Sequence, residues 1–184
     1  MAVNIDSHAQ RLVEKHMFRV NRQTDYAVRV LLALSQKPQG TRISTTEIGR
    51  EMLIPRALLQ RIVAALASGG FILTQAGRDG GISLAHAPKQ INLLQVVEHF
   101  EGQIILSDCI LKRGDCPFEH KCPVSCQWKH LSDLLREEMA RTTFEQLVED
   151  AKRIERELHV SASISTTEPV PVVRNLSLAD NVSL

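Results

Sequence analysis

Residues 44–84 carry the pattern that most restricts how this chain of 184 residues can fold. Ser44 and Glu47 form a capping box that opens a short helix, and Pro55 suits the first turn of the next helix. Gly69-Gly70 ends that second helix, and two apolar runs around a glycine-rich turn follow. The order of helix, tight turn, helix and hairpin predicts a winged helix-turn-helix.

Apolar periodicity predicts that the rest of the chain is helical, so the expected fold is mainly α with a small β-hairpin. In this fold a winged helix-turn-helix domain is followed by dimerisation helices. The individual elements are expected at Asn21–Ser35, Phe71–Thr74, Ile82–Leu84, Ile91–Phe100, Gln127–Ala140 and, after a Thr143 cap, up to Leu158.

Four regions are expected along the chain. Residues 1–16 form an N-terminal extension, and residues 17–90 form the winged helix-turn-helix domain. Residues 91–158 contain a cysteine loop and the dimerisation helices. Residues 159–184 are expected to be a flexible C-terminal tail, because they contain few charges and show no helical pattern.

The second helix of the predicted pair has one apolar and one polar side. The apolar stripe consists of Leu58, Leu59, Ile62, Val63 and Leu66, which leaves a basic, hydrogen-bonding face made by Arg56, Ala57, Gln60 and Arg61. Arg can bond guanine, and Gln can bond adenine, through two hydrogen bonds in the major groove. This face therefore predicts binding to double-stranded DNA.

Two neighbouring segments support the same prediction. Hydroxyl groups and free backbone N–H groups that suit phosphate are expected at the start of the preceding helix, at Ser44, Thr45 and Thr46. Arg78 lies in the glycine-rich tip of the hairpin, from which it can enter a narrow minor groove.

The distribution of charge agrees with a local anion-binding surface. The whole chain has a formal net charge of +1. Residues 37–61 contain five basic and two acidic side chains, a local excess of three positive charges, whereas residues 131–159 contain five basic and eight acidic ones. One segment is therefore suited to an anionic partner and the other is not.

All four cysteines of the chain fall within eighteen residues: Cys109, Cys116, Cys122 and Cys126. No apolar run is long enough to cross a membrane and no secretion signal is recognised, so a cytoplasmic location is expected. The reducing cytosol disfavours disulfides, and metal binding or redox sensing is the expected role of the thiols.

The spacing between the cysteines favours an iron-sulfur cluster, of the 4Fe-4S or 2Fe-2S type. Structural zinc ligands usually have about two to four residues between them, a spacing that only the last pair shows. Wider gaps suit a loop that wraps a larger inorganic core, and thiolates are soft enough for iron. A zinc site and a thiol-disulfide switch stay open as alternatives.

Several of these motifs together resemble one known group of proteins. They are the opening Thr24-Asp25-Tyr26-Ala27-Val28-Arg29, the pair Ile54-Pro55, the hairpin from Gly77 to Ala85, three of the cysteines, and Trp128. Over about Met17 to Leu158, the chain is similar to the winged-helix regulators that include IscR, NsrR and RirA. The resemblance implies a homodimer, formed through the long helix after the cysteine loop, that places each cluster close to the partner's first helix.

The resemblance also implies the cluster ligands, which would be Cys109, Cys116 and Cys122. The position of the histidine ligand of IscR-like members is occupied here by Ser125. In NsrR-like members the fourth ligand is an aspartate of the other subunit, which matches Asp25. The thiolate of Cys126 is the rival ligand, and a histidine, His120 or His130, is the remaining alternative.

The expected function is therefore a DNA-binding transcription regulator that recognises a roughly palindromic operator. Its affinity would change with an iron-sulfur cluster that senses nitric oxide, redox state or iron supply. Neither a phosphate-binding Gly-Lys motif nor a nucleophile elbow is present, so an enzyme is not expected. The alternatives are a zinc-stabilised or thiol-based regulator and an iron-sulfur electron-transfer component.

Overall fold

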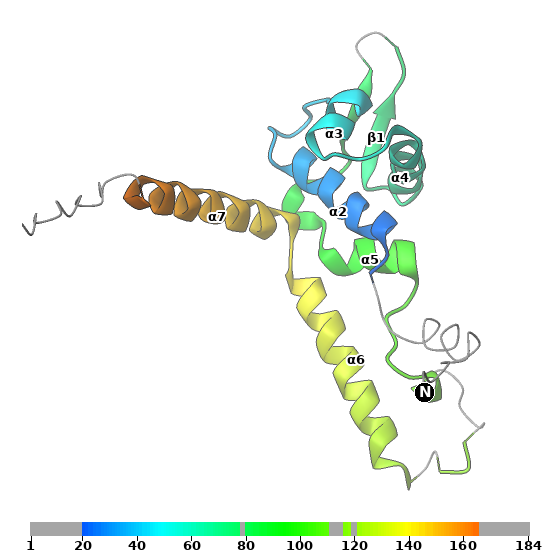
Figure 1. Cartoon of the computed structure of the whole chain (residues 1–184). Coiled ribbons are helices and arrows are strands. Elements are labelled where there is room, and N and C mark those ends of the chain that lie inside the picture. The colour runs from blue at the N-terminus through cyan, green and yellow to red at the C-terminus, as the bar shows by residue number, and fades with distance from the viewer. Residues whose placement is uncertain (1–19, 78–79, 111–115, 119–120, 166–184) are drawn as a thin grey trace, which may run out of the picture. The chain divides into compact units, whose positions relative to one another are not determined.

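The computed structural model describes residues 20–77, 80–110, 116–118 and 121–165 (Figure 1). The chain divides into two units, residues 1–149 and 150–184. The predicted N-terminal extension, Arg78 and His120 lie outside the described residues, as does the end of the chain from residue 166. The domain limits predicted from the sequence stay predictions.

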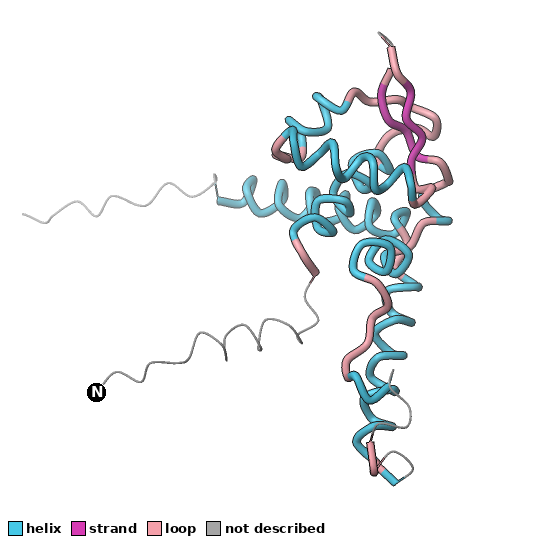
Figure 2. The backbone as a smooth tube through the Cα atoms, turned by 90° about the vertical axis from the view of Figure 1, so that its right-hand side faces the viewer, coloured by secondary structure: helices cyan, strands magenta, loops and turns pink. Residues whose placement is uncertain are grey.

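The described residues contain six α-helices, two short 3-10 helices and one two-stranded antiparallel hairpin (Figures 1 and 2). This arrangement confirms a mainly α fold with a small β-hairpin. In chain order the elements are α2 (Arg22–Ser35), α3 (Thr45–Glu51), α4 (Arg56–Ser68), β1 (Ile72–Gln75), β2 (Gly81–Leu84), η1 (Pro88–Gln90), α5 (Leu93–Glu101), η2 (Asp108–Ile110), α6 (Pro123–Arg141) and α7 (Phe144–Ser165).

Helix α2 lies at the centre of the apolar core. The side chain of Asn21 caps it by accepting hydrogen bonds from the backbone N–H groups of Gln23 and Thr24, at 2.8 and 3.0 Å. Its apolar residues recur at helical spacing, which buries one side of the helix against α4 and α5. The fully buried residues on that side include Ala27, Val30 and Leu31.

Helices α3 and α4 form the predicted helix-turn-helix. Ser44 Oγ accepts a hydrogen bond from the backbone N–H of Glu47 at 3.1 Å and so caps α3. Leu53, in the turn, adopts a positive φ of 53°. In α4 the buried positions are those predicted for the apolar stripe, with Leu59, Ile62 and Leu66 at its centre.

The hairpin is joined to the segment that precedes α3. β1 and β2 pair in the register Ile72 with Leu84 and Gln75 with Gly81. Ile43 and Ile82 exchange two backbone hydrogen bonds, at 3.0 and 2.9 Å. A Cβ atom on Gly81 would lie 2.5 Å from the carbonyl oxygen of Ile43, so this close approach requires glycine.

Helix α5 is connected to the link between α6 and α7. Asn92 and Gln95 form a capping box at the start of α5. The backbone N–H of Leu93 then bonds to Thr142, and that of Phe144 bonds to Ile91, at 2.9 and 3.0 Å. These bonds place the fully buried ring of Phe144 in the core.

Two helix limits differ from the sequence prediction by more than two residues. α6 begins at Pro123 instead of Gln127, because a proline at the first helical position lacks only an N–H that would have no partner there. Cys126 therefore lies in a helix and not in the loop. α7 continues to Ser165, so residues 159–165 are helical where a flexible tail was predicted; the first proline after them is Pro169.

Across the described part of the chain, no helix has the length and apolar character that a membrane span requires.

Candidate DNA interface and cysteine loop

The predicted polar face of α4 lies on the surface of the molecule. Arg56, Ala57, Gln60 and Arg61 are all exposed, while the opposite side of the helix is buried in the core. Helix α4 contains no acidic residue. Its exposed face therefore offers guanidinium and amide hydrogen-bond donors without a nearby carboxylate on the same helix to repel phosphate.

A hollow brings the starts of α3 and α4 together. Two of the predicted phosphate-binding residues and two of the predicted base-reading residues share its wall, which is lined by Thr45, Thr46, Gly49, Ile54, Arg56, Leu59 and Gln60. A second hollow lies between α3, α4 and the hairpin, and its lining includes Ser44, Thr45, Thr74 and Gln75. Thr45 borders both hollows, so the helix-turn-helix and the hairpin form one continuous surface. Arg61 and Ala57 are exposed on α4 without lining either hollow.

The sequence prediction missed the hairpin residues Thr74 and Gln75. Both are exposed on β1, and no motif marked them, because only the packing of the hairpin beside α3 brings them to this surface.

The four cysteines lie between α5 and α6 or in the first turn of α6. Cys109 is in η2, Cys116 follows in the loop, and Cys122 is the N-cap of α6. These three thiols are free and half-buried, whereas the thiol of Cys126 is free and belongs to an exposed residue. The hydroxyl of Ser107 lies 2.9 Å from Cys109 Sγ.

The described part of the chain does not bring the predicted ligands together. Within the described residues, no three Cys, His, Asp or Glu side chains lie close enough to one another to hold a metal ion. Asp25 instead forms an ion pair with Arg29 at 2.9 Å, and both side chains are about half exposed. His130 is exposed on α6. The donor chemistry fits an iron-sulfur cluster, since three free thiols occur on one short segment, but the described residues do not by themselves complete a site.

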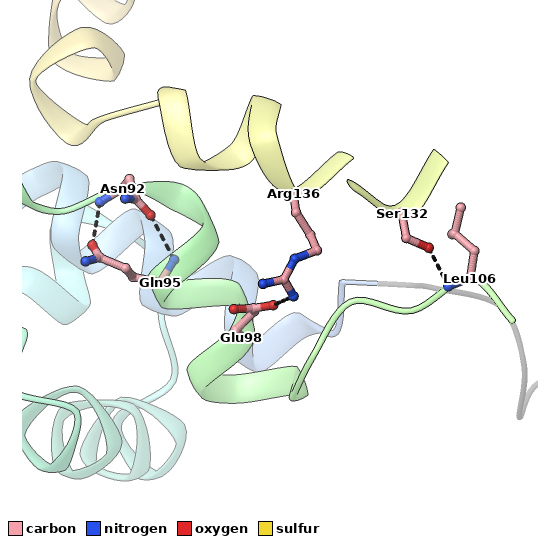
Figure 3. A network of polar contacts seen from close by, with 6 residues as sticks. All are labelled: Asn92, Gln95, Glu98, Leu106, Ser132 and Arg136. Carbon is pink, nitrogen blue, oxygen red and sulfur yellow. Dashed lines mark hydrogen bonds and ion pairs between the residues drawn. The ribbon is translucent and has the colours of Figure 1, made fainter. Parts of the chain in front are cut away.

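Helix α6 holds the segment that leads into the cysteine loop (Figure 3). The buried hydroxyl of Ser132 accepts a hydrogen bond from the backbone N–H of Leu106 at 3.2 Å and donates one to the carbonyl of Trp128 at 2.9 Å. One turn further along α6, the guanidinium of Arg136 pairs with the carboxylate of Glu98 on α5. The segment that leads into the cysteine loop is therefore fixed to α6 through Leu106.

Glu101, the last residue of α5, joins the start of α2 to the beginning of the loop. Its carboxylate accepts hydrogen bonds from the backbone N–H and the side-chain amide of Asn21, at 2.8 and 2.9 Å, and from the buried hydroxyl of Thr24. Asp25 is the next residue of α2. The sequence prediction missed Glu101, because these partners are separated by 77 and 80 positions and share no motif.

The fold and the exposed face of α4 define a winged helix-turn-helix transcription regulator. The chain belongs to the Rrf2 family, described as "Iron-dependent Transcriptional regulator", which matches residues 20–150. This is a family of transcriptional regulators and not of enzymes.

Curated relatives carry the name "HTH-type transcriptional regulator NsrR". The chain is 32% identical to the protein from Bacillus licheniformis over 91 residues, which are 50% of this chain and 64% of that relative. It is 28% identical to the protein from Oceanobacillus iheyensis over 141 residues, which are 76% of this chain and 92% of the relative. The chain thus spans less than two thirds of the first of these relatives.

Solved structures share the fold. CymR, "the Global Cysteine Regulator of B. subtilis", superposes with a TM-score of 0.60 at 20% identity, over 72% of this chain and 98% of that one. T. potens IscR superposes with a TM-score of 0.59 at 19% identity, over 73% of this chain and 88% of that one. At these identities the likeness shows the fold alone.

Proposed function

We propose that an iron-sulfur cluster, held by Cys109, Cys116 and Cys122, controls the DNA binding of this transcription regulator. The observation that supports the proposal is a set of three free, half-buried thiols on the segment that joins α5 to α6. Thiolates are soft ligands that suit iron. The family to which the chain belongs is described as iron-dependent, which agrees with this chemistry.

The cluster site is proposed to be completed in a homodimer. Helix α6 exposes Val124, Trp128, Leu131 and Leu134, an apolar surface that a second copy of the chain would cover. In such a dimer the carboxylate of the partner's Asp25 is the proposed fourth ligand. Asp25 is half exposed, and so is Arg29, with which it forms an ion pair in the same chain. Cys126 is the competing ligand because its residue is exposed and lies four positions after Cys122.

The DNA contacts are proposed on the surface formed by α3, α4 and the hairpin. Arg56 and Gln60 would read purine edges in the major groove, and the hydroxyl groups at the start of α3 would contact phosphate. Arg78 would enter the minor groove, a proposal that rests on the sequence alone. A two-fold dimer reads two half-sites, so the operator would be roughly palindromic.

When bound, the cluster would supply a centre that reacts with nitric oxide or oxygen and that depends on iron supply. The contribution of the chain is the connection between the loop and the DNA-reading helices. Leu106 is bonded to α6 and Glu101 is bonded to the start of α2, which packs on α4. A change in the loop would therefore be transmitted through these contacts to α4, the proposed recognition helix.

The test is purification without oxygen, followed by a visible absorption spectrum and by iron and sulfide analysis. Operator binding is then measured before and after the cluster is removed. Absorbance from a cluster, with iron and sulfide in the same samples and a change in DNA affinity on removal, supports the proposal. Zinc without sulfide would overturn it, and so would a cluster whose loss leaves DNA binding unchanged.

A further inference from the structure

The C-terminal end of the recognition helix α4 is held by a side chain of another helix. α4 has no basic residue in its last turn. His99 of α5 lies there instead, with its Nε2 atom 2.9 Å from the carbonyl oxygen of Ala65. Because a carbonyl oxygen can only accept, Nε2 must carry the hydrogen and donate it. The same carbonyl also accepts hydrogen bonds from the backbone N–H of Gly69 and the hydroxyl of Ser68, at 3.0 and 2.9 Å, so the imidazole adds a contact from a second helix to a carbonyl that already has partners.

The surroundings of His99 are shaped to admit its ring. The imidazole makes edge-on contacts with Phe71 and Phe100, at centroid distances of 5.6 and 5.2 Å. A Cβ atom on Gly69, directly after α4, would lie 2.9 Å from the Cε1 atom of His99 and 2.7 Å from the ring of Phe71. Glycine at this position is therefore needed for the ring to reach the end of α4.

The last turn of α5 also binds two further helices. The carboxylate of Glu98, the residue before the imidazole, pairs with Arg136 of α6 (Figure 3). Two residues after the imidazole, Glu101 accepts hydrogen bonds from Asn21 at the start of α2. Three side chains within four consecutive residues therefore connect α5 to α6, to α4 and to α2.

We propose that His99 is a positioning residue for DNA binding, which fixes the end of α4 on α5 and, together with the Glu98–Arg136 pair, ties the recognition helix to α6. The proposal rests on the DNA-binding surface described above. In a two-fold regulator the orientation of each recognition helix sets the spacing of the two half-sites. A fixed contact at the end of α4 therefore determines how well both helices match one operator.

The experiment first selects an operator for the wild-type protein from random duplex DNA. It then compares all variants in the one state, cluster-bound or cluster-free, in which the wild-type protein binds that operator. Loss of the hydrogen bond in His99→Leu is expected to weaken operator binding about three- to tenfold. His99→Gln, whose amide can donate to the same carbonyl, is expected to stay within about twofold of wild type.

His86→Leu is the matched control. His86 is an exposed histidine that lies near Gly69, and among the described residues its imidazole makes no hydrogen bond to α4. This variant should bind as the wild type does. Thermal unfolding of each variant reports folding separately from affinity. Wild-type affinity in His99→Leu, or equal losses in folded His99→Leu and His99→Gln, would overturn the positioning role. A wild-type protein that selects no DNA sequence would instead overturn the proposed function itself.

The connection to α6 is tested with Arg136→Met, alone and combined with His99→Leu. If the two contacts act in series, breaking either one breaks the connection, and the double variant should bind operator no more weakly than the weaker single variant. Their effects on thermal stability should still add, because the contacts are separate. If the loss of operator affinity in the double variant equals the product of the losses in the two single variants, the contacts act independently. That result would overturn the link to α6.

Discussion

The carboxylate of Glu101 accepts hydrogen bonds from both the backbone and the side chain of Asn21, across 80 positions of the sequence. One oxygen of this carboxylate also accepts from the hydroxyl of Thr24, which is fully buried. The last residue of α5 is therefore also a cap for the start of α2. The polar contact lies at the point where the cysteine loop begins.

Glu101→Ala should destabilise the fold by about 1 to 3 kcal/mol, because the amide of Asn21 loses its acceptor and the buried hydroxyl of Thr24 keeps only a long contact of 3.4 Å to Asn21 Oδ1. Urea denaturation followed by circular dichroism measures the change. Glu101→Gln retains one acceptor oxygen and should lose less. Equal stability of the alanine variant and the wild type would show that the contact contributes nothing.

A substitution at Leu53 is expected to stabilise the fold. The φ of Leu53 is 53°, in the left-handed region, and the residue is 82% exposed in the turn between α3 and α4. Leu53→Gly should raise the free energy of unfolding by about 1 kcal/mol, because glycine adopts this conformation without a Cβ clash. Leu53→Ala keeps the clash and is the control. A glycine variant no more stable than the alanine variant would contradict the argument.

The recognition face predicts a loss of sequence preference. Arg56→Ala and Gln60→Ala should each reduce the preference for operator over unrelated DNA by about 1 to 3 kcal/mol, through lost contacts to base edges. Arg78→Ala should weaken binding through the minor groove. Competition gel shifts measure both effects, and Lys152→Ala, at an exposed position of α7, is the control. If all three variants bind like the parent, this docking of α4 must be abandoned.

The exposed apolar face of α6 predicts a dimer. Sedimentation velocity at micromolar concentration should give the mass of two chains. Leu131→Asp combined with Leu134→Asp should give monomers, because two carboxylates would have to be buried in the interface. Leu73→Asp, a matched change at an exposed apolar position of β1 outside the predicted dimerisation helices, is the control. A wild-type monomer would contradict both the interface and the shared cluster site.

Local chemistry explains which parts of this molecule were predictable from the sequence. The Ser44 cap, the buried stripe of α4 and the end of α4 at Gly69-Gly70 depend on residues a few positions apart, so periodicity and capping rules predicted them. The contacts of Glu101 and of Arg136 depend on how α2, α5 and α6 pack. No pattern along the chain indicates such pairs in advance.

The cysteine loop shows the same limit for the site. Its spacing predicted a metal-binding segment, and the structure places three half-buried thiols there. Their grouping around a metal ion does not occur among the described residues of one chain. The sequence pattern identifies donor atoms, but the spacing of cysteines along the chain does not determine whether those atoms converge in space.

The final prediction concerns the cluster and its fourth ligand. Replacing Cys109, Cys116 or Cys122 by Ala should abolish the visible absorbance of anaerobically purified protein, because water and hydroxyl groups replace a thiolate poorly. Asp25→Ala should leave a cluster that assembles but is lost faster to nitric oxide or chelator, since a carboxylate binds iron less tightly than a thiolate does. Asp25→Ala also removes the ion pair with Arg29, so Arg29→Ala is the matched control for that loss. If Cys126 were the ligand, Cys126→Ala would lose the cluster while Asp25→Ala kept wild-type absorbance and reactivity. A normal cluster in both single variants would exclude both residues and leave His120, His130 or an external thiol as the fourth ligand.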